Sequence, residues 1–351
     1  MTTSLVRQTL PRPRPRPRVA PTGVHGTTAP GFASVRHSFE RACRDSGPPA
    51  SQGAALAVVQ DGELVVDLWH GTADPVTGTP WTGDTLEPVL TGSHGILATA
   101  VLLLADMGAL ALDRPVADYW PEFATRGEDA LTLRDVLTFT ARLPGVPHGP
   151  WPAGRTAGRT AGCIAAEVIR RVDGRDLDLF FLEEIAGPLG LDIHFGLVPD
   201  QLPHIARLSY DADFRARFPA PDGRADGSGA DGSGAVFFGR VVVPSLGAYA
   251  SARGLARLQA VLASDAVRPP GEEPLLLSRR TLDQARNLWA EEPDPLFGAF
   301  GHRGPGGIAY RAWPQARAGA AWLRGRLTTG GPDARILDEV AGAVVRAPRT
   351  A

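Results

Sequence analysis

Residues 91–94 read Thr-Gly-Ser-His and bring two hydroxyls and an imidazole close together in the sequence. A hydroxyl becomes a nucleophile when a neighbouring base takes its proton, and imidazole titrates near neutral pH. Thr91 and His94 are three residues apart, so on a helix they share one face. One alternative is therefore an esterase or acyltransferase that uses Thr91 as nucleophile and His94 as base.

Ser93 is a second candidate nucleophile. Residues 91–95 approximate the Gly-x-Ser-x-Gly turn of α/β-hydrolases, with Thr91 in place of the first glycine, and His302 could supply the histidine. That turn belongs to a parallel sheet in which strands and helices alternate, whereas the chain before Thr91 predicts a β-hairpin. The surrounding pattern therefore argues against this alternative.

The main prediction is acid–base chemistry without a covalent intermediate, and the two nucleophile hypotheses are its alternatives. His94 and His302 could move a proton while Arg142 and Tyr249 polarise a carbonyl, as in cyclisation, dehydration, lactone opening or isomerisation. The expected substrate is a small ester- or carbonyl-bearing metabolite, in keeping with specialised metabolism. A catalytically dead binding or scaffold protein is the fourth hypothesis. The enzyme hypotheses predict that His94 and His302 meet in one enclosed cavity, whereas an inactive protein can have that cavity filled.

Lysine is absent from the 351 residues, so all 36 basic residues are arginine. A guanidinium does not lose its proton in proteins, which excludes Schiff-base enzymes, P-loop phosphate binders and hydrolases with a lysine base. The formal net charge of -2 gives no bias towards nucleic acid or anionic membranes. Cys43 and Cys163 lie too far apart in sequence to suggest a metal site or a disulfide framework. We therefore expect a cytoplasmic protein that needs no cofactor or metal.

The hydrophobic pattern predicts one folded domain over residues 31–351, after a disordered Arg- and Pro-rich tail at 1–30 that could dock an acidic partner. A helical lobe is expected at 90–265, with a flexible polar insertion at 220–235. Helices are expected at residues 32–42, 96–104, 131–139, 162–172, 177–189, 251–263, 278–290 and 336–345, and strands at 54–59, 64–69, 297–313 and 318–327. The fold class is α/β in the broad, α+β sense, with both chain ends forming one antiparallel sheet flanked by helices.

Three further segments resemble the serine β-lactamase-related hydrolases, and among them the class C-like esterase and transesterase branch. They are Trp-His-Gly-Thr-Ala-Asp-Pro at 69–75, Ala-Asp-Tyr-Trp-Pro-Glu-Phe at 117–123 and Phe-Leu-Glu-Glu-Ile-Ala-Gly-Pro-Leu-Gly-Leu at 181–191. The resemblance extends from about Gly31 to the C-terminus. It implies a β-lactamase/transpeptidase-like fold with a site between the sheet and the helical lobe.

The motifs of that family are only partly present. Members carry Ser-x-x-Lys at the start of the buried helix, a tyrosine in the helical lobe, and His-x-Gly or Lys-x-Gly on a strand of the pocket. Residues 91–94 replace both the serine and the lysine, and no tyrosine lies near Thr156, where the second motif is expected. His302 and Gly304 match the third motif, and Arg142 replaces a glycine in a turn beside the pocket. The resemblance thus implies a hydrolase fold with altered or lost hydrolase chemistry.

Overall fold

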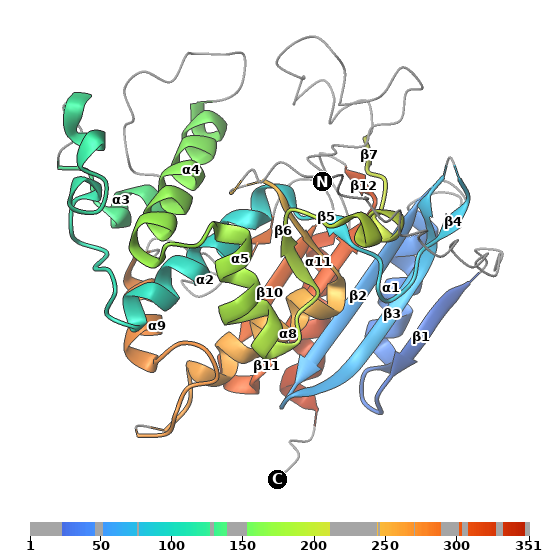
Figure 1. Ribbon diagram of the computed structural model, residues 1–351. Helices are drawn as coiled ribbons and strands as arrows, with labels where there is room; N and C mark the ends of the chain where they lie inside the picture. Colours follow the sequence, from blue (N-terminus) through green and yellow to red (C-terminus); the bar gives the residue numbers. More distant parts are fainter. Residues whose placement is uncertain are drawn as a thin grey trace, which may run out of the picture.

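Both ends of the chain contribute to one central sheet in the computed structural model (Figure 1). The strand order is β1, β3, β2, β11, β10, β9, with β4 beside β3, and all of these pairs are antiparallel. The strands are β1 Val24–Thr28, β2 Gly53–Gln60, β3 Glu63–Asp74, β4 Thr79–Pro80, β9 His302–Arg303, β10 Ala309–Trp313 and β11 Ala318–Arg324. In the β2–β11 pair, Ala57 lies opposite Ala321, which joins the two chain ends. The predicted antiparallel sheet is confirmed.

The structure describes residues 23–45, 52–75, 77–126, 130–138, 153–210, 244, 246–269, 271–288, 302–303, 308–327 and 333–347. At residues 45, 125–126, 153–160, 210, 286–288, 302–303 and 333–334 it describes the backbone alone. The predicted insertion at 220–235 lies outside the described residues.

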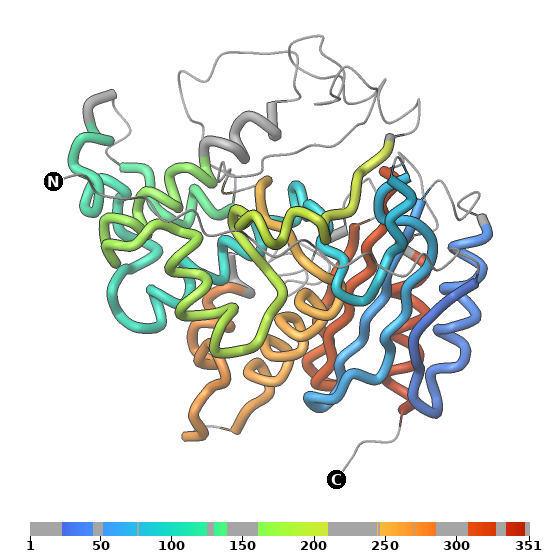
Figure 2. Tube along the Cα trace, turned by 45° about the vertical axis from the view of Figure 1, so that its right-hand side comes forward, coloured from blue at the N-terminus to red at the C-terminus, as the bar shows by residue number. Residues whose placement is uncertain are grey.

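Helices cover both faces of the sheet (Figures 1 and 2). On one face, α1 (Ala33–Asp45) and α11 (Asp333–Arg346) pack together, and Phe39 of α1 meets Trp322 of β11 edge to face at 5.4 Å between ring centres. On the other face lies α8 (Ala252–Asp265), so close that a Cβ on Gly319 would come within 2.2 Å of the Ala260 nitrogen. Because both faces are covered, β2 and β11 are buried along their whole length, which explains their continuous apolar sequence.

The helical lobe is built around α2 (Ser93–Asp106), which is buried on nearly every side. A 3-10 turn, η2 (Leu90–Gly92), leads directly into it. The other helical segments are η3 Val116–Asp118, η4 Pro121–Arg126, α3 Leu133–Leu137, α4 Ala153–Asp173, α5 Leu177–Phe181, the π-helix η5 Leu182–Ala186, α6 Gly187–Leu189, η6 Pro199–His204, α9 Arg279–Leu288 and η8 Pro314–Ala316. The apolar run at 96–104 thus forms the buried helix that its sequence predicts.

Two small sheets lie beside the central sheet and the lobe. In one of them, β8 (Ala248–Ala250) lies between β5 (Glu87–Pro88) and β6 (Ile193–Phe195), and all pairs are antiparallel. In the other, β7 (Ser209–Tyr210) pairs in parallel with β12 (Arg326–Leu327). The first of these sheets matters for function, because β5 immediately precedes the turn that starts α2.

The structure differs from the expected boundaries in three places. The edge strand β1 lies inside the segment 1–30 that was expected to be a tail, because Val24 to Thr28 pair with β3 and Arg36 donates hydrogen bonds to the Val24 and Gly26 carbonyls at 3.2 Å. The expected boundary at residue 31 is therefore wrong. Within the predicted helix 177–189 the chain forms a π-helix, and α4 begins at Ala153, before the expected start at 162.

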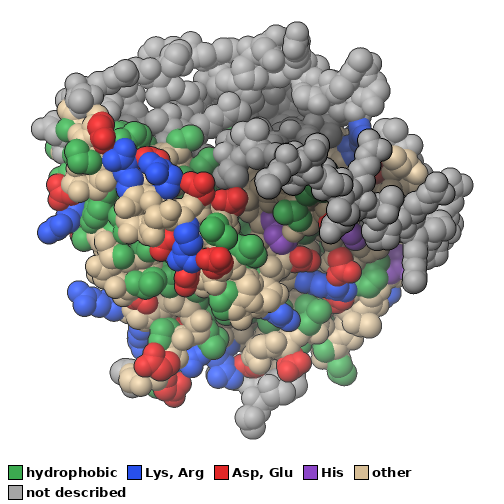
Figure 3. Space-filling model, viewed as in Figure 1, with side chains coloured by type: hydrophobic (Ala, Val, Ile, Leu, Met, Phe, Trp, Pro, Cys, Tyr) green, Lys and Arg blue, Asp and Glu red, His purple; other side chains and the backbone are tan. Residues whose placement is uncertain are grey.

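Charged side chains of both signs are interspersed on the face shown in Figure 3. On the helical lobe, Arg175 forms ion pairs with Asp173, Glu183 and Glu184 at 2.6 to 2.8 Å. None of the helices in the described ranges is both long enough and apolar enough to cross a membrane.

Cys43 is buried and Cys163 is exposed. Both are free thiols, so no disulfide joins them.

Candidate functional site

The candidate site begins with a strained residue in front of α2. Leu90 has a φ of 51°, in the left-handed region that ordinary side chains rarely adopt. Such a conformation costs about 1–3 kcal/mol and is found most often at functional sites. The turn that follows leaves Thr91 exposed and Ser93 buried. The backbone therefore presents the first hydroxyl of the Thr-Gly-Ser-His segment and hides the second.

Three consecutive residues after Thr91 are each bound to a different part of the fold. The carbonyl of Gly92 accepts a short hydrogen bond from the Tyr310 hydroxyl on β10 of the central sheet. The hydroxyl of Ser93 accepts the Ala248 N–H on β8 at 3.1 Å. The Nε2–H of His94 donates to the Leu137 carbonyl at the end of α3 at 2.8 Å. The segment thus lies at the seam of sheet, small sheet and lobe.

The bond to Leu137 determines the tautomer of His94. A carbonyl oxygen can only accept, so the proton must sit on Nε2, and in the neutral ring the lone pair is then on Nδ1. Burial lowers the pKa of His94 from its ordinary value of 6.5 to about 4, although the hydrogen bond to Leu137 acts in the opposite direction. Near neutral pH, His94 is therefore an uncharged imidazole whose Nδ1 can accept a proton or a hydrogen bond.

Tyr310 on β10 holds this turn through its hydrogen bond to the Gly92 carbonyl. Its side chain is fully buried, and burial raises its pKa above the ordinary value of 10. A phenol with so high a pKa stays protonated, so it can donate to Gly92 but cannot act as a proton acceptor. Its role in the structure is to fix the position of the turn before His94. Tyr310 is not among the candidate site residues expected from the sequence.

Ser93 and Tyr249 are placed in packed surroundings. Ser93 is 0% exposed, and its hydroxyl oxygen receives the Ala248 N–H. Tyr249, the neighbour of Ala248 on β8, is also 0% exposed and packs with Leu86 and Leu197. Both residues lie close to the seam, but the described structure gives them packing and anchoring roles.

His302 is brought near the site by strand pairing. On β9 it pairs with Tyr310 of β10, whose hydroxyl reaches the start of α2. The backbone of His302 therefore lies beside the strand residue whose side chain contacts Gly92. Arg142 and Gly304 lie outside the described residues. That His94 and His302 share one cavity remains a prediction.

The ionisable residues of the described ranges include no group of three His, Cys, Asp or Glu side chains that could hold a metal ion. The chemistry that this arrangement can perform rests on the residues at the start of α2. They are an exposed threonine hydroxyl, a neutral imidazole one turn further on, and the positive end of a buried helix dipole, which stabilises negative charge.

The pH dependence of stability provides a test of the His94 environment. The pKa is about 4 in the folded protein and 6.5 in the unfolded chain, so the unfolded chain binds more protons between these values. The free energy of unfolding should therefore fall as the pH drops from about 6.5 towards 4. From about pH 7.5 to about pH 4.5 the loss attributable to His94 should be about 2.5 kcal/mol.

Urea unfolding at the two pH values measures this loss. His94→Gln keeps an N–H that can reach the Leu137 carbonyl but does not titrate, so its stability should vary less with pH by that amount. An identical pH dependence in the variant and the wild type would contradict the buried, neutral state of His94.

The chain matches the Beta-lactamase family over residues 46–330. It is 34% identical over 219 residues to Esterase/beta-lactamase LipL of Mycobacterium tuberculosis, an alignment covering 55% of this chain and 50% of LipL. It is also 38% identical over 95 residues to Esterase EstB of Burkholderia gladioli, covering 26% of this chain and 24% of EstB. The matched part thus spans half or less of these curated relatives.

Solved structures resemble nearly the whole chain. A penicillin-binding protein homolog from Caulobacter crescentus has a TM-score of 0.74 at 27% identity, and the match covers 92% of this chain and all of that protein (100%). A family VIII carboxylesterase has a TM-score of 0.72 at 25% identity, with the same coverage of 92% and 100%. The similarity includes the central sheet and the helical lobe together.

Proposed function

Since the chain belongs to the beta-lactamase family, we propose that it hydrolyses small esters by acyl transfer, with Thr91 as nucleophile and His94 as base. The observation that carries this proposal is the state of His94. Its Nε2 proton is held by Leu137, so the lone pair of the neutral ring is on Nδ1, one helical turn from an exposed hydroxyl. Nucleophilic catalysis needs a neutral base within hydrogen-bond reach of the hydroxyl, and we propose that His94 Nδ1 takes this position toward Thr91.

The reaction would proceed in two steps. Thr91 Oγ1 attacks the ester carbonyl carbon while His94 Nδ1 takes the hydroxyl proton, and that proton then passes to the departing alkoxide. The alcohol leaves and an acyl-threonine remains. Water, deprotonated by the same nitrogen, next attacks the acyl carbon, releases the carboxylic acid and returns the proton to Thr91. The α2 dipole stabilises the negative charge on the carbonyl oxygen in both steps.

Esters are the proposed substrate class for two reasons. The relatives LipL and EstB are named esterases, and a similar structure is a carboxylesterase. The low pKa of His94 also makes it a weak base, and an ester has a better leaving group than an amide. Lysine, which would be a stronger base at this position, is absent from the chain.

Proton transfer without an acyl-enzyme is a second candidate function. The β-branched side chain of Thr91 restricts the approach of its hydroxyl to a carbonyl carbon. The same His94 lone pair could instead deprotonate a carbonyl-bearing metabolite or a water molecule directly. This candidate predicts turnover of a substrate with no covalent adduct on the protein.

One experiment separates these possibilities. The purified full-length chain is incubated with para-nitrophenyl acetate and butyrate and, separately, with a fluorophosphonate probe, and the adduct is located by peptide mass spectrometry. Ester turnover with the probe on Thr91 is the expected result. Adduct on Ser93 would identify Ser93 as the nucleophile in place of Thr91, turnover without adduct would support the second candidate, and neither turnover nor adduct would indicate an inactive binding protein.

A further inference from the structure

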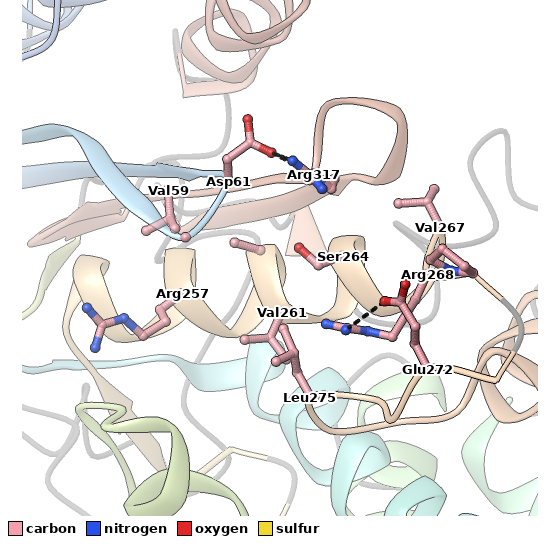
Figure 4. A pocket seen from close by; sticks show the side chains of 13 residues that line it. Val59, Asp61, Arg257, Val261, Ser264, Val267, Arg268, Glu272, Leu275 and Arg317 are labelled. Carbon is pink, nitrogen blue, oxygen red and sulfur yellow. Dashed lines mark hydrogen bonds and ion pairs between the residues drawn. The ribbon is translucent and has the colours of Figure 1, made fainter. Parts of the chain in front are cut away.

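A groove runs along one face of α8 (Figure 4). Its volume is about 400 Å³, within the range of small-molecule sites. Arg257, Ala260, Val261 and Ser264 line it at spacings of three, one and three residues, which places them on a single helix face. The groove therefore has a continuous floor that starts with a guanidinium and continues with small and apolar side chains.

Two hairpin turns form one wall of the groove. Asp61 between β2 and β3 and Arg317 between β10 and β11 both have left-handed backbones, with φ of 51° and 44°. They hold each other through an Arg317–Asp61 ion pair at 2.6 Å and the Asp61 N–H bond to the Arg317 carbonyl at 3.1 Å. The two turns of this wall are therefore held together by both a side-chain contact and a backbone contact.

The segment after α8 forms the opposite wall. Leu275 faces the groove across from Val261 and is 51% exposed, an unusual position for a large apolar side chain (Figure 4). Arg268 lies at the same end, where it is paired with Asp265 at 3.3 Å and with Glu272 at 3.5 Å. Leu275 and Val261 thus leave apolar surface open inside the groove.

The arginines of the groove differ in their partners. Arg317 and Arg268 are bound to carboxylates. Arg257 is exposed, and among the described residues its polar contact is one long hydrogen bond of 3.4 Å to the Gly190 carbonyl. A second hollow of about 320 Å³ shares Val59 and Arg257 with the first, so Arg257 stands between them. Its guanidinium is the cation that can take an anionic ligand.

We propose that this groove binds a medium-chain monocarboxylate. The carboxylate would pair with the planar Arg257 guanidinium, which matches it in a bidentate geometry. The hydrocarbon chain would lie over Ala260 and Val261 and against Leu275. From Arg257 to Ser264 the helix rises roughly 10 Å, enough length for such a chain. No residue of the Thr91 segment lines the groove. Binding of a carboxylate there can therefore be tested independently of ester hydrolysis.

Decanoate below its micelle-forming concentration is a suitable probe. Titration by calorimetry and by amide NMR should show saturable binding that shifts the signals of residues 257–264. Affinity should rise from acetate to hexanoate to decanoate, and decanol, which lacks the charge, should bind more weakly. Arg257→Gln should weaken decanoate binding at least about tenfold, and Val261→Asn should reduce the gain from chain length.

Matched controls make the outcome specific. Arg114→Gln removes another exposed arginine far from the groove and should leave decanoate binding unchanged. Thr91→Ala should leave it unchanged as well, which separates this groove from the proposed active site. Lack of binding, equal binding by Arg257→Gln, or signal shifts confined to residues 91–94 would each overturn the proposal.

Discussion

Replacing Thr91 by alanine is expected to lower the rate of para-nitrophenyl ester hydrolysis at least about 100-fold and to abolish labelling by the fluorophosphonate probe. The variant removes the hydroxyl that the strained turn at Leu90 presents. The three hydrogen bonds made by Gly92, Ser93 and His94 do not involve this hydroxyl and should remain. Initial rates and intact mass measure the two effects.

The rate of ester hydrolysis by the wild type should stay constant as the pH is lowered until about pH 4, where His94 becomes protonated.

Two variants serve as controls for Thr91. Thr91→Ser keeps the hydroxyl and removes only the branching methyl, so it should retain or raise the rate. Ser93→Ala should retain labelling, because Ser93 is buried, although it leaves the Ala248 N–H without its acceptor and should cost about 1–3 kcal/mol of stability. Full activity in Thr91→Ala would refute the proposed mechanism.

The largest effect on stability is expected at Asp265. Its side chain is 0% exposed and accepts the N–H groups of Leu275, Leu276 and Leu277 at 2.8 to 3.0 Å, besides its ion pair with Arg268. Asp265→Ala would leave three backbone donors at the end of α8 without their acceptor and would leave Arg268 paired with Glu272 alone. The free energy of unfolding should therefore fall by roughly 4 kcal/mol.

Chemical unfolding of Asp265→Ala beside Asp118→Ala tests this expectation. Asp118 is 48% exposed and lies 4.0 Å from Arg114, so its loss should change stability by less than about 0.5 kcal/mol. Similar values for the two variants would show that the chain segment after α8 does not depend on Asp265. Decanoate binding should also weaken in Asp265→Ala, since this segment forms one wall of the groove.

The fold could be predicted from the sequence wherever the pattern is local and strong. The runs that form β2 and β3 flank an Asp-Gly turn, and the apolar run of α2 is too uniform for a half-exposed helix. The sequence does not predict the edge strand β1, because Val24 to Thr28 contain few apolar residues and are held by pairing with a distant strand. The π-helix at Leu182 to Ala186 has no local signal of its own.

The site could be predicted only as a set of candidates. The spacing of Thr91 and His94 gives their shared helix face, but their environments come from groups that no local pattern reveals. A backbone carbonyl at Leu137 selects the tautomer of His94, and Tyr310 reaches Gly92 from more than 200 residues away in the chain. The difference between the exposed Thr91 and the buried Ser93 likewise depends on the left-handed Leu90.

The three bonds at the start of α2 also make this turn sensitive to motion. The central sheet, the small sheet and the helical lobe each hold one of three consecutive residues. If the lobe shifts against the sheet, either one of these bonds breaks or the turn moves with its partner, and in both cases the orientation of Thr91 changes. Opening and closing of the seam and reactivity of the hydroxyl are therefore mechanically coupled.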